Sequence, residues 1–254
     1  MNFFYGISND LFKSEIQIPL FQNRNFKKSN LKLFKSYPKN NKWILQEISN
    51  KKKIHDYFYI LKNEDILSNE IFFLADETIL DEFDDKKLKN FNNFTDTSPA
   101  FRANFKIYLN QGGFSSYQSE YPYSMITKNG TILSSISSIA NSDADKNYVL
   151  IKNIFEEPIE ENFKAYLVNY KTKSIEEQFE IKTNYTNCIE ISNKLIKPEI
   201  FLTTDKYLGI PMYVSVKNSF LSFEHTHPPH EYILSENKFI KVTNLKKEIN
   251  EIIS

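Results

Sequence analysis

Hydrophobic and polar residues alternate with a period of two along much of the second half of the chain. The alternation is clearest over residues 105–110 and 210–216, and residues 163–170 and 174–183 form a matched pair around a polar turn at 171–173. A period of two places successive side chains on opposite faces of a strand. The pattern therefore predicts about seven antiparallel strands from residue 99 onward, at the regular spacing of a sandwich or barrel.

Residues 1–75 contain shorter apolar runs that are separated by polar breaks. The candidate strands are residues 31–36, 43–48, 57–61 and 71–74. The continuous apolar runs at 57–61 and 71–74 indicate strands that are covered on both faces. Residues 77–90 differ, because acidic residues come first and lysines last, an order that complements a helix dipole. They predict one short surface helix.

The end of the chain predicts a second helix, over residues 243–253, which Thr243 or Asn244 would cap. Three apolar residues of this helix share one stripe: Leu245, Ile249 and Ile252. Long helical patterns between strands are absent, which argues against a parallel sheet. The predicted fold is mainly β: an antiparallel two-sheet sandwich, immunoglobulin-like or jelly-roll-like, over residues 98–254, with a smaller β-rich region over residues 1–97.

Composition narrows the classes of partner and compartment. The 32 basic and 32 acidic residues give a net charge of zero, so we expect no nucleic-acid partner. Cys188 is the single cysteine, which rules out an intrachain disulfide. No signal peptide and no apolar run long enough to cross a bilayer is visible, so we expect no membrane insertion and a cytoplasmic location.

Three of the four histidines lie within six positions: His225, His227 and His230. Alternation places His225 and His227 on the face of the apolar Leu221 and Phe223, at the end of a strand. The following Pro228-Pro229 stops the strand and could direct His230 or Glu231 back toward the pair. Imidazole and carboxylate ligands predict a divalent-metal site that suits Zn, Fe or Mn.

The spacing of His225, His227 and Glu231 resembles the first ligand trio of the cupin family, over about seven residues. The flanking glycines of that motif are replaced by Ser219 and Lys238, and no histidine follows for a second motif. The resemblance therefore implies cupin-like metal chemistry and not membership. The alternative is a rigid polar turn whose imidazoles bond to backbone carbonyls.

A second candidate site lies in a segment, residues 112–125, that is rich in Tyr, Ser and Gln. Its candidate ligand-binding residues are Tyr117, Gln118, Glu120, Tyr121 and Tyr123, with Arg102 as an anchor for a charged group. Tyrosine offers a large, rigid, amphipathic contact area, and Ser and Gln offer adaptable hydrogen bonds. The segment predicts a recognition loop, and the alternative is a strand pair whose hydroxyls face water.

Three functions follow from these features. The first is a non-catalytic binding or accessory protein that recognises a glycan or a protein through the Tyr-rich loop. The second is a small metal-dependent enzyme that uses the histidine cluster. The third is a structural subunit of an assembly, which would expose a large apolar patch.

Overall fold

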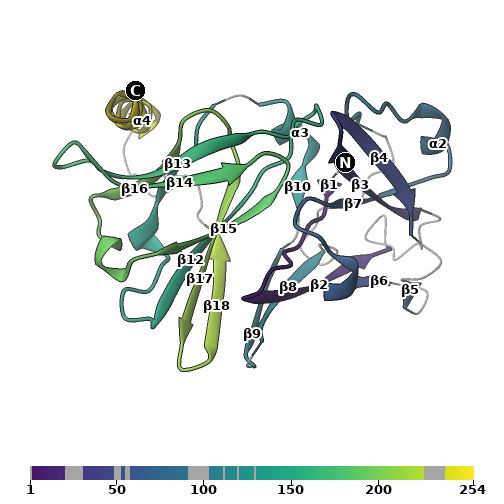
Figure 1. Cartoon of the computed structure of the whole chain (residues 1–254), viewed down its shortest axis with the longest axis horizontal. Helices are drawn as coiled ribbons and strands as arrows, with labels where there is room; N and C mark the ends of the chain where they lie inside the picture. The colour runs from purple at the N-terminus through teal and green to yellow at the C-terminus, as the bar shows by residue number, and fades with distance from the viewer. Residues whose placement is uncertain are drawn as a thin grey trace. The chain divides into compact units, whose positions relative to one another are not determined.

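The computed structural model describes residues 2–20, 31–48, 53–54, 58–90, 103–110, 112–118, 120–128, 130–225 and 238–254. Within these residues the chain is mainly β, and each pairing between strands is antiparallel (Figure 1). A helix stands near the C-terminus. The predicted mainly β, antiparallel class is confirmed, and the sheets are consistent with a sandwich. An immunoglobulin-like or jelly-roll-like topology stays a prediction.

The chain divides into two compact units. Unit 1 comprises Met1–Lys128, Ile154–Glu160 and Asn184–Thr186, and unit 2 comprises Asn129–Asn153, Glu161–Thr183 and Asn187–Ser254. This division differs from the boundary expected between residues 97 and 98. Strands β8 (Asn104–Leu109) and β9 (Phe114–Gln118) belong to unit 1, because β8 pairs with β2 (Phe12–Pro19) and β9 pairs with β8.

Unit 1 contains three sheets, of orders β5–β6–β2–β8–β9, β4–β3–β7 and β1–β10. The remaining bounds are β1 (Asn2–Phe3), β3 (Lys32–Lys39), β4 (Lys42–Glu47), β5 (Lys53–Ile54), β6 (Phe58–Leu61), β7 (Ile71–Ala75) and β10 (Tyr121–Pro122), with the short helical turns η1 (Asn63–Asp65), α2 (Ile79–Glu82) and α3 (Tyr123–Ile126). Ile16 and Ile18 on β2 and Leu33 on β3 share one apolar core with Phe72 and Leu74 on β7. The two larger sheets therefore bury one face each against a common core.

The helix expected over residues 77–90 is much shorter, since α2 ends at Glu82. Backbone groups beyond it are used by other parts of unit 1. The Asp85 carbonyl accepts a hydrogen bond of 2.6 Å from the Trp43 amide, and the Leu88 amide also donates outside the helix. A longer helix would need these groups for its own bonds between residues four apart.

Trp43, the chain's single tryptophan, lies on β4 and is only 1% exposed. Its indole Nε1–H donates to the Glu156 carbonyl at 2.9 Å, and the Leu88 amide donates to the same oxygen at 2.8 Å. The Lys87 ammonium lies 2.9 Å from Glu156 Oε2. These contacts with Glu156 hold the segment Ile154–Glu160 within unit 1.

Asn184 holds the third segment of unit 1 in place. It lies in the left-handed region (φ 49°) and is 1% exposed. Its Oδ1 accepts from the Phe155 amide at 2.8 Å, and its Nδ2 donates to the carbonyls of Glu157 and Ile159, each at 3.1 Å. One side chain thus satisfies three buried or part-buried backbone groups. Positive φ suits asparagine, which tolerates this conformation better than most residues.

Replacing Asn184 by glycine should therefore destabilise the protein through the side chain alone, because glycine also accepts the positive φ. Losing three hydrogen bonds should lower the free energy of unfolding by about 2–4 kcal/mol. The matched control is Asn40→Gly, at an exposed turn residue with φ 53°. Urea denaturation followed by circular dichroism measures both variants, and equal effects would contradict the role given to the Asn184 amide.

Unit 2 contains two four-stranded sheets, of orders β11–β16–β13–β14 and β15–β12–β17–β18. Their bounds are β11 (Leu133–Ser135), β12 (Lys146–Lys152), β13 (Asn162–Asn169), β14 (Ser174–Lys182), β15 (Thr186–Ile191), β16 (Ile200–Thr204), β17 (Ile210–Lys217) and β18 (Phe220–His225), with the 3₁₀ turns η3 (Ile136–Ser138) and η4 (Asn193–Leu195). The hairpin expected around residues 171–173 is present as β13 and β14.

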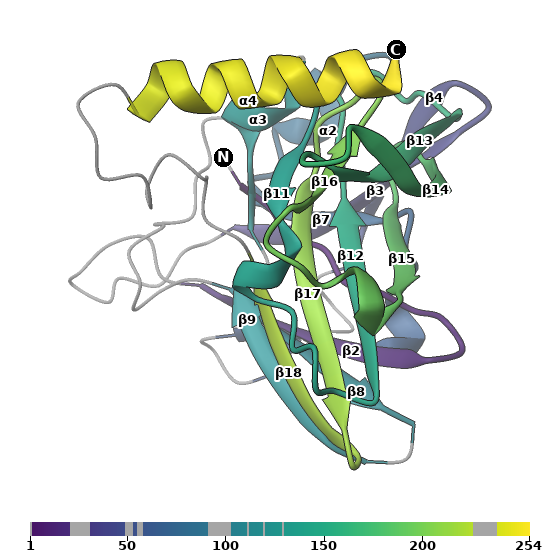
Figure 2. The same cartoon turned by 90° about the vertical axis from the view of Figure 1, so that its left-hand side faces the viewer.

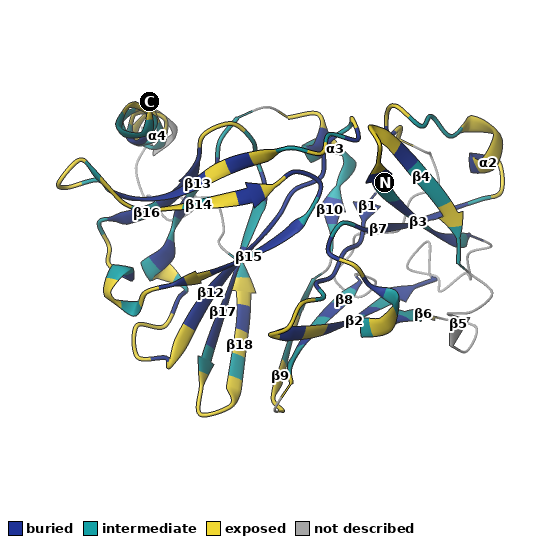
Figure 3. Ribbon diagram, in the orientation of Figure 1, coloured by how far each residue is buried: buried dark blue, intermediate teal, exposed yellow. Residues whose placement is uncertain are grey.

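Side chains from both sheets of unit 2 meet in one apolar core. Among its members are Val149, Ile151, Ala165, Leu167, Ile189, Leu202 and Tyr213. A hydrogen bond of 2.9 Å between Ser134 Oγ and the Tyr213 hydroxyl joins the sheets inside the core. Burial raises the pKa of Tyr213, so its hydroxyl stays neutral. Strand β12 is buried at every position but its first (Figure 3).

Helix α4 (Lys238–Ile253) packs on the outer face of the sheet that contains β13 and β16 (Figure 2). Its predicted stripe of Leu245, Ile249 and Ile252 contacts Tyr166 and Val168 of β13. The predicted cap is wrong. The helix begins at Lys238, so Thr243 and Asn244 lie inside it.

Polar contacts flank the apolar stripe of α4 on both sides. On one side the Lys246 ammonium donates to the Thr131 carbonyl at 2.6 Å, and burial lowers the pKa of this lysine. On the other side Glu248 Oε2 lies 2.8 Å from the Lys173 ammonium. Hydrogen bonds from Lys173 and Tyr170 lower the pKa of Glu248. The polar contacts fix how α4 is rotated about its own axis. The burial of the apolar stripe stabilises the packing of α4 on the sheet.

Replacing Ile249, which is fully buried, by alanine should lower the free energy of unfolding by about 2–4 kcal/mol through the cavity left under α4. Ile240→Ala is the control, because Ile240 is on the same helix and 62% exposed. Its effect should stay within about 0.5 kcal/mol. Chemical denaturation measures the difference, and a neutral Ile249→Ala would show that α4 adds little to the stability of unit 2.

Candidate functional site

His225 is the one member of the predicted metal cluster within the described residues. His227, His230 and Glu231 lie outside them. His225 ends β18 opposite Met212, and Phe223 pairs with Val214. The neighbouring Tyr213 of β17 points into the sandwich core. His225 therefore shares the face of the buried Phe223, as expected, but this face is the one opposite the sandwich core.

In the described part of the chain, no three His, Cys, Asp or Glu side chains are close enough to hold a metal ion. The predicted site draws three of its four ligands from residues outside that part, so it stays a prediction. The chemistry of the donor set, imidazole nitrogens with a carboxylate, suits Zn, Fe or Mn.

If the cluster binds a metal, the gently purified protein should contain about one Zn, Fe or Mn per chain by elemental analysis. The double variant His225→Ala with His227→Ala should lose it. His55→Ala is the control, since His55 is the fourth histidine and lies outside the cluster. Metal-free protein, or equal metal content in all variants, would refute the cluster as a metal site.

The Tyr-rich segment is largely a strand followed by a turn, not a loop. Its first part is β9, and the later residues form β10 and α3. Tyr121 is fully buried, and burial raises its pKa. The Tyr123 hydroxyl is within hydrogen-bonding distance of the Leu88 carbonyl and Glu156 Oε1, at 3.3 and 3.4 Å. Burial, and then the charge of Glu156, raise the pKa of Tyr123.

The other predicted residues of this segment divide between two faces. Tyr117 pairs with the buried Phe105, so it lies on the inner face of its sheet. Gln118 pairs with Asn104 and lies on the outer face. Glu120 accepts a hydrogen bond of 3.3 Å from the Ala103 amide. Arg102 lies outside the described residues. Of the predicted set, Gln118 alone is placed on the outer face of this sheet.

That outer face is formed by three adjacent strands of unit 1. Alternation along β2, β8 and β9 sends one set of side chains to the core and the other outward. We name the outward set the β2–β8–β9 face, and it consists of Lys13, Glu15, Gln17, Asn104, Lys106, Tyr108, Phe114, Ser116 and Gln118. The pairing of β2 with β8 brings residues about 90 positions apart in sequence next to one another.

Phe114 and Tyr108 form an aromatic pair on the β2–β8–β9 face. Phe114 is 63% exposed, and it is one of several large apolar side chains that face solvent in the described residues. The ring centroids lie 5.7 Å apart, with planes inclined by 33°. The pair presents a broad apolar surface to solvent and keeps its geometry through cross-strand contact.

Fixed polar groups lie beside the aromatic pair. Glu15 Oε1 lies 3.0 Å from the Lys106 ammonium and 2.9 Å from Gln17 Nε2, which donates to it. Partial burial raises the pKa of Glu15, but the contacts with Gln17 and Lys106 outweigh it and lower the pKa below its ordinary value. The carboxylate is therefore ionised at neutral pH and oriented by two partners.

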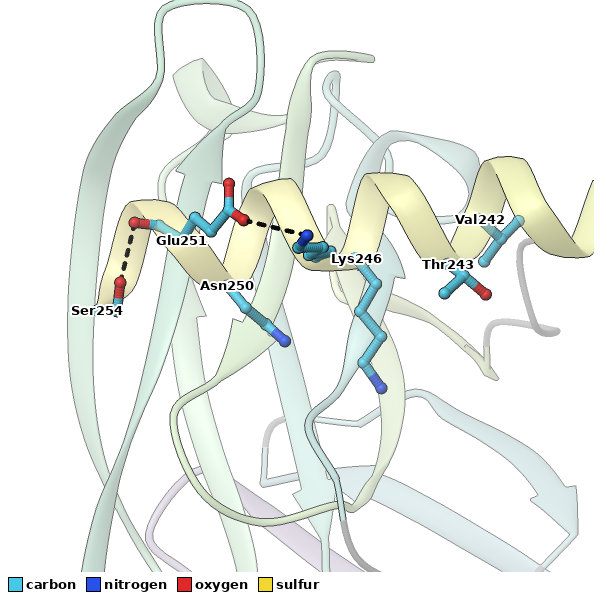
Figure 4. A pocket seen from close by; sticks show the side chains of 7 residues that line it. Val242, Thr243, Lys246, Asn250, Glu251 and Ser254 are labelled. Carbon is cyan, nitrogen blue, oxygen red and sulfur yellow. Dashed lines mark hydrogen bonds and ion pairs between the residues drawn. The ribbon is translucent and has the colours of Figure 1, made fainter.

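Two shallow hollows lie elsewhere on the described surface. One, of about 570 Å³, runs along the flank of α4 (Figure 4). It is lined by residues of α4 and by Ser254, which follows the helix, and its Lys247 and Glu251 pair with each other at 3.9 Å. The other, of about 610 Å³, surrounds the acidic residues at α2. Each is built from one short segment, so side chains from different elements do not converge in it.

Three comparisons with known proteins gave no match to this chain. No family model, no curated protein and no solved structure matches it. Within the described residues, no helix has the length and apolar character needed to cross a membrane. The chemistry of the surface itself therefore carries the functional argument.

Four residues of this face were not among the candidate site residues predicted from the sequence: Phe114, Tyr108, Lys106 and Glu15. The alternation of residues 105–110 did indicate that Lys106 and Tyr108 point away from the core. Phe114 lies inside the Tyr-rich segment, but it was not among the candidate ligand-binding residues of that segment. No local sequence pattern marks Glu15 as a site residue, because only the pairing of β2 with β8 brings it beside Lys106.

Proposed function

We propose that the protein is a non-catalytic binding protein that recognises a glycan on the β2–β8–β9 face. The observation that carries the proposal is Phe114, an exposed ring held against Tyr108. The C–H groups on the apolar side of a sugar ring carry slight positive charge. They favour the negative face of an aromatic ring, which is the usual electrostatic preference of such rings.

The polar neighbours supply what sugar hydroxyls need. Glu15 offers carboxylate oxygens as acceptors, and the amides of Gln17 and Gln118 can both donate and accept. Lys106 already pairs with Glu15, so its charge is largely neutralised at short range. A face with one stacking platform and several amides favours neutral, hydroxyl-rich ligands over anionic ones.

Phe114→Ala should weaken binding to the best glycan of a printed array by about tenfold or more, as expected for the loss of a central aromatic contact. The matched control is Phe220→Ala, which removes a phenylalanine that is 78% exposed on β18 of unit 2. That variant should bind as the parent does. Titration calorimetry with the selected free oligosaccharide gives the two affinities.

Two results would refute the proposal. One is an array that shows no saturable binding to any glycan, and the other is an equal loss in Phe114→Ala and Phe220→Ala. Binding to immobilised proteins without glycan binding would favour a protein partner instead. Glu15→Gln keeps the shape of the side chain and removes its charge, so it separates the contribution of the carboxylate charge from that of stacking.

A further inference from the structure

Strand β9 lies at the edge of its sheet, and β8 is its one partner among the described strands. The Leu109 amide donates to the Gly113 carbonyl at 3.2 Å, which makes their pair a hydrogen-bonded one. Hydrogen-bonded and non-hydrogen-bonded pairs alternate along an antiparallel ladder. The pair Lys106–Ser116 is therefore of the second kind, and the N–H and C=O of Ser116 point away from β8.

The sequence of β9 leaves this edge unprotected. Edge strands are commonly guarded by charged residues, bulges or short length. Strand β14 is protected in two ways. It carries charged residues, among them Glu176 and Glu180, and its register shifts against β13. Strands β11 and β5 span three and two residues. Strand β9, Phe-Ser-Ser-Tyr-Gln, has five residues and no charge, no proline and no shift against β8.

We propose that β9 pairs antiparallel with β9 of a second copy of this chain, centred on Ser116. The outward N–H and C=O of the two Ser116 residues would then exchange hydrogen bonds across a two-fold axis. Phe114 lies opposite Gln118 of the second copy, and Ser115 lies opposite Tyr117 of the second copy. The two sheets join into one continuous sheet.

The charges of the chain allow a second copy as the occupant. The net charge of the chain is zero, so two copies do not repel each other at long range. The nearest like charges on the β2–β8–β9 face are the two Lys106 ammonium groups. Three strand spacings would separate them, roughly 14 Å, which exceeds the screening length at physiological salt. Serine faces serine at the axis, without charge or bulk.

Pairing uses backbone groups at the edge of β9, whereas glycan binding uses side chains on its outer face. The inference therefore does not depend on the proposed function. The contact is small, so association should be reversible and depend on concentration. Sedimentation velocity of the full chain, from micromolar to millimolar concentration, should show a monomer–dimer equilibrium.

Substitutions at Ser116 test the two-fold axis directly, because this residue is exposed and would face its own copy. Ser116→Lys and Ser116→Glu should each raise the dimer dissociation constant by about fivefold, since like charges then stand directly opposite. An equimolar mixture of the two should form a heterodimer at least as tight as the parent dimer. Ser222→Lys is the control, at an exposed serine in the middle of the edge strand β18.

Restored association in the mixture, with loss in each variant alone, would support the axis at Ser116. The inference is overturned by a parent protein that stays monomeric throughout, as expected if the edge instead takes an extended peptide. It is equally overturned if Ser116→Lys dimerises as the parent does, or if Ser222→Lys weakens the dimer to the same degree.

Discussion

The alternation of side chains across each sheet decides which faces must be covered and which remain open. On β13, Ala165 and Leu167 enter the sandwich core, while Tyr166 and Val168 face outward and are also buried. A strand that is apolar on both faces needs two covers. Helix α4 is the second cover, so its position follows from β13.

Strand β2 shows the opposite case. Its inward residues, such as Ile16 and Ile18, are fully buried, while Glu15 and Gln17 face outward. A strand with one apolar face needs a single cover. The outer side of β2, β8 and β9 is therefore free to carry chemistry, and the exposed Phe114 marks where that face departs from a merely solvated surface. The same principle thus places both the structural helix and the candidate binding face.

Local patterns in the sequence were sufficient for several elements. The hairpin of β13 and β14 is visible in its two alternating halves and the polar turn between them. The stripe of α4 could also be predicted, because Leu245, Ile249 and Ile252 repeat at helical spacing. The start of α4 was predicted too late, because Thr243 and Asn244 are residue types that favour the N-cap position and yet lie inside the helix. The end of α2 depends on a distant hydrogen bond from Trp43 that no local pattern contains.

The candidate site shows the same limit. Gln118 was predicted from residue chemistry, but Tyr121 was selected by the same reasoning and is buried. Whether a tyrosine faces water depends on strand register. Once one residue of a strand is paired, the face to which each of its other side chains points is fixed as well. The approach of Glu15 to Lys106 depends on pairing across about 90 residues. Such long-range pairing is set by the whole core, so a single sequence does not reveal it.

The burial of Trp43 has a practical consequence for any study of this protein by fluorescence. The chain has one indole, and it is enclosed in unit 1 with its Nε1–H bonded to the Glu156 carbonyl. A red shift in its emission would report solvent reaching unit 1. Unit 2, which contains no tryptophan, would contribute only tyrosine emission. The optical signal thus distinguishes the two units without any label, and a single-wavelength unfolding curve describes one of them.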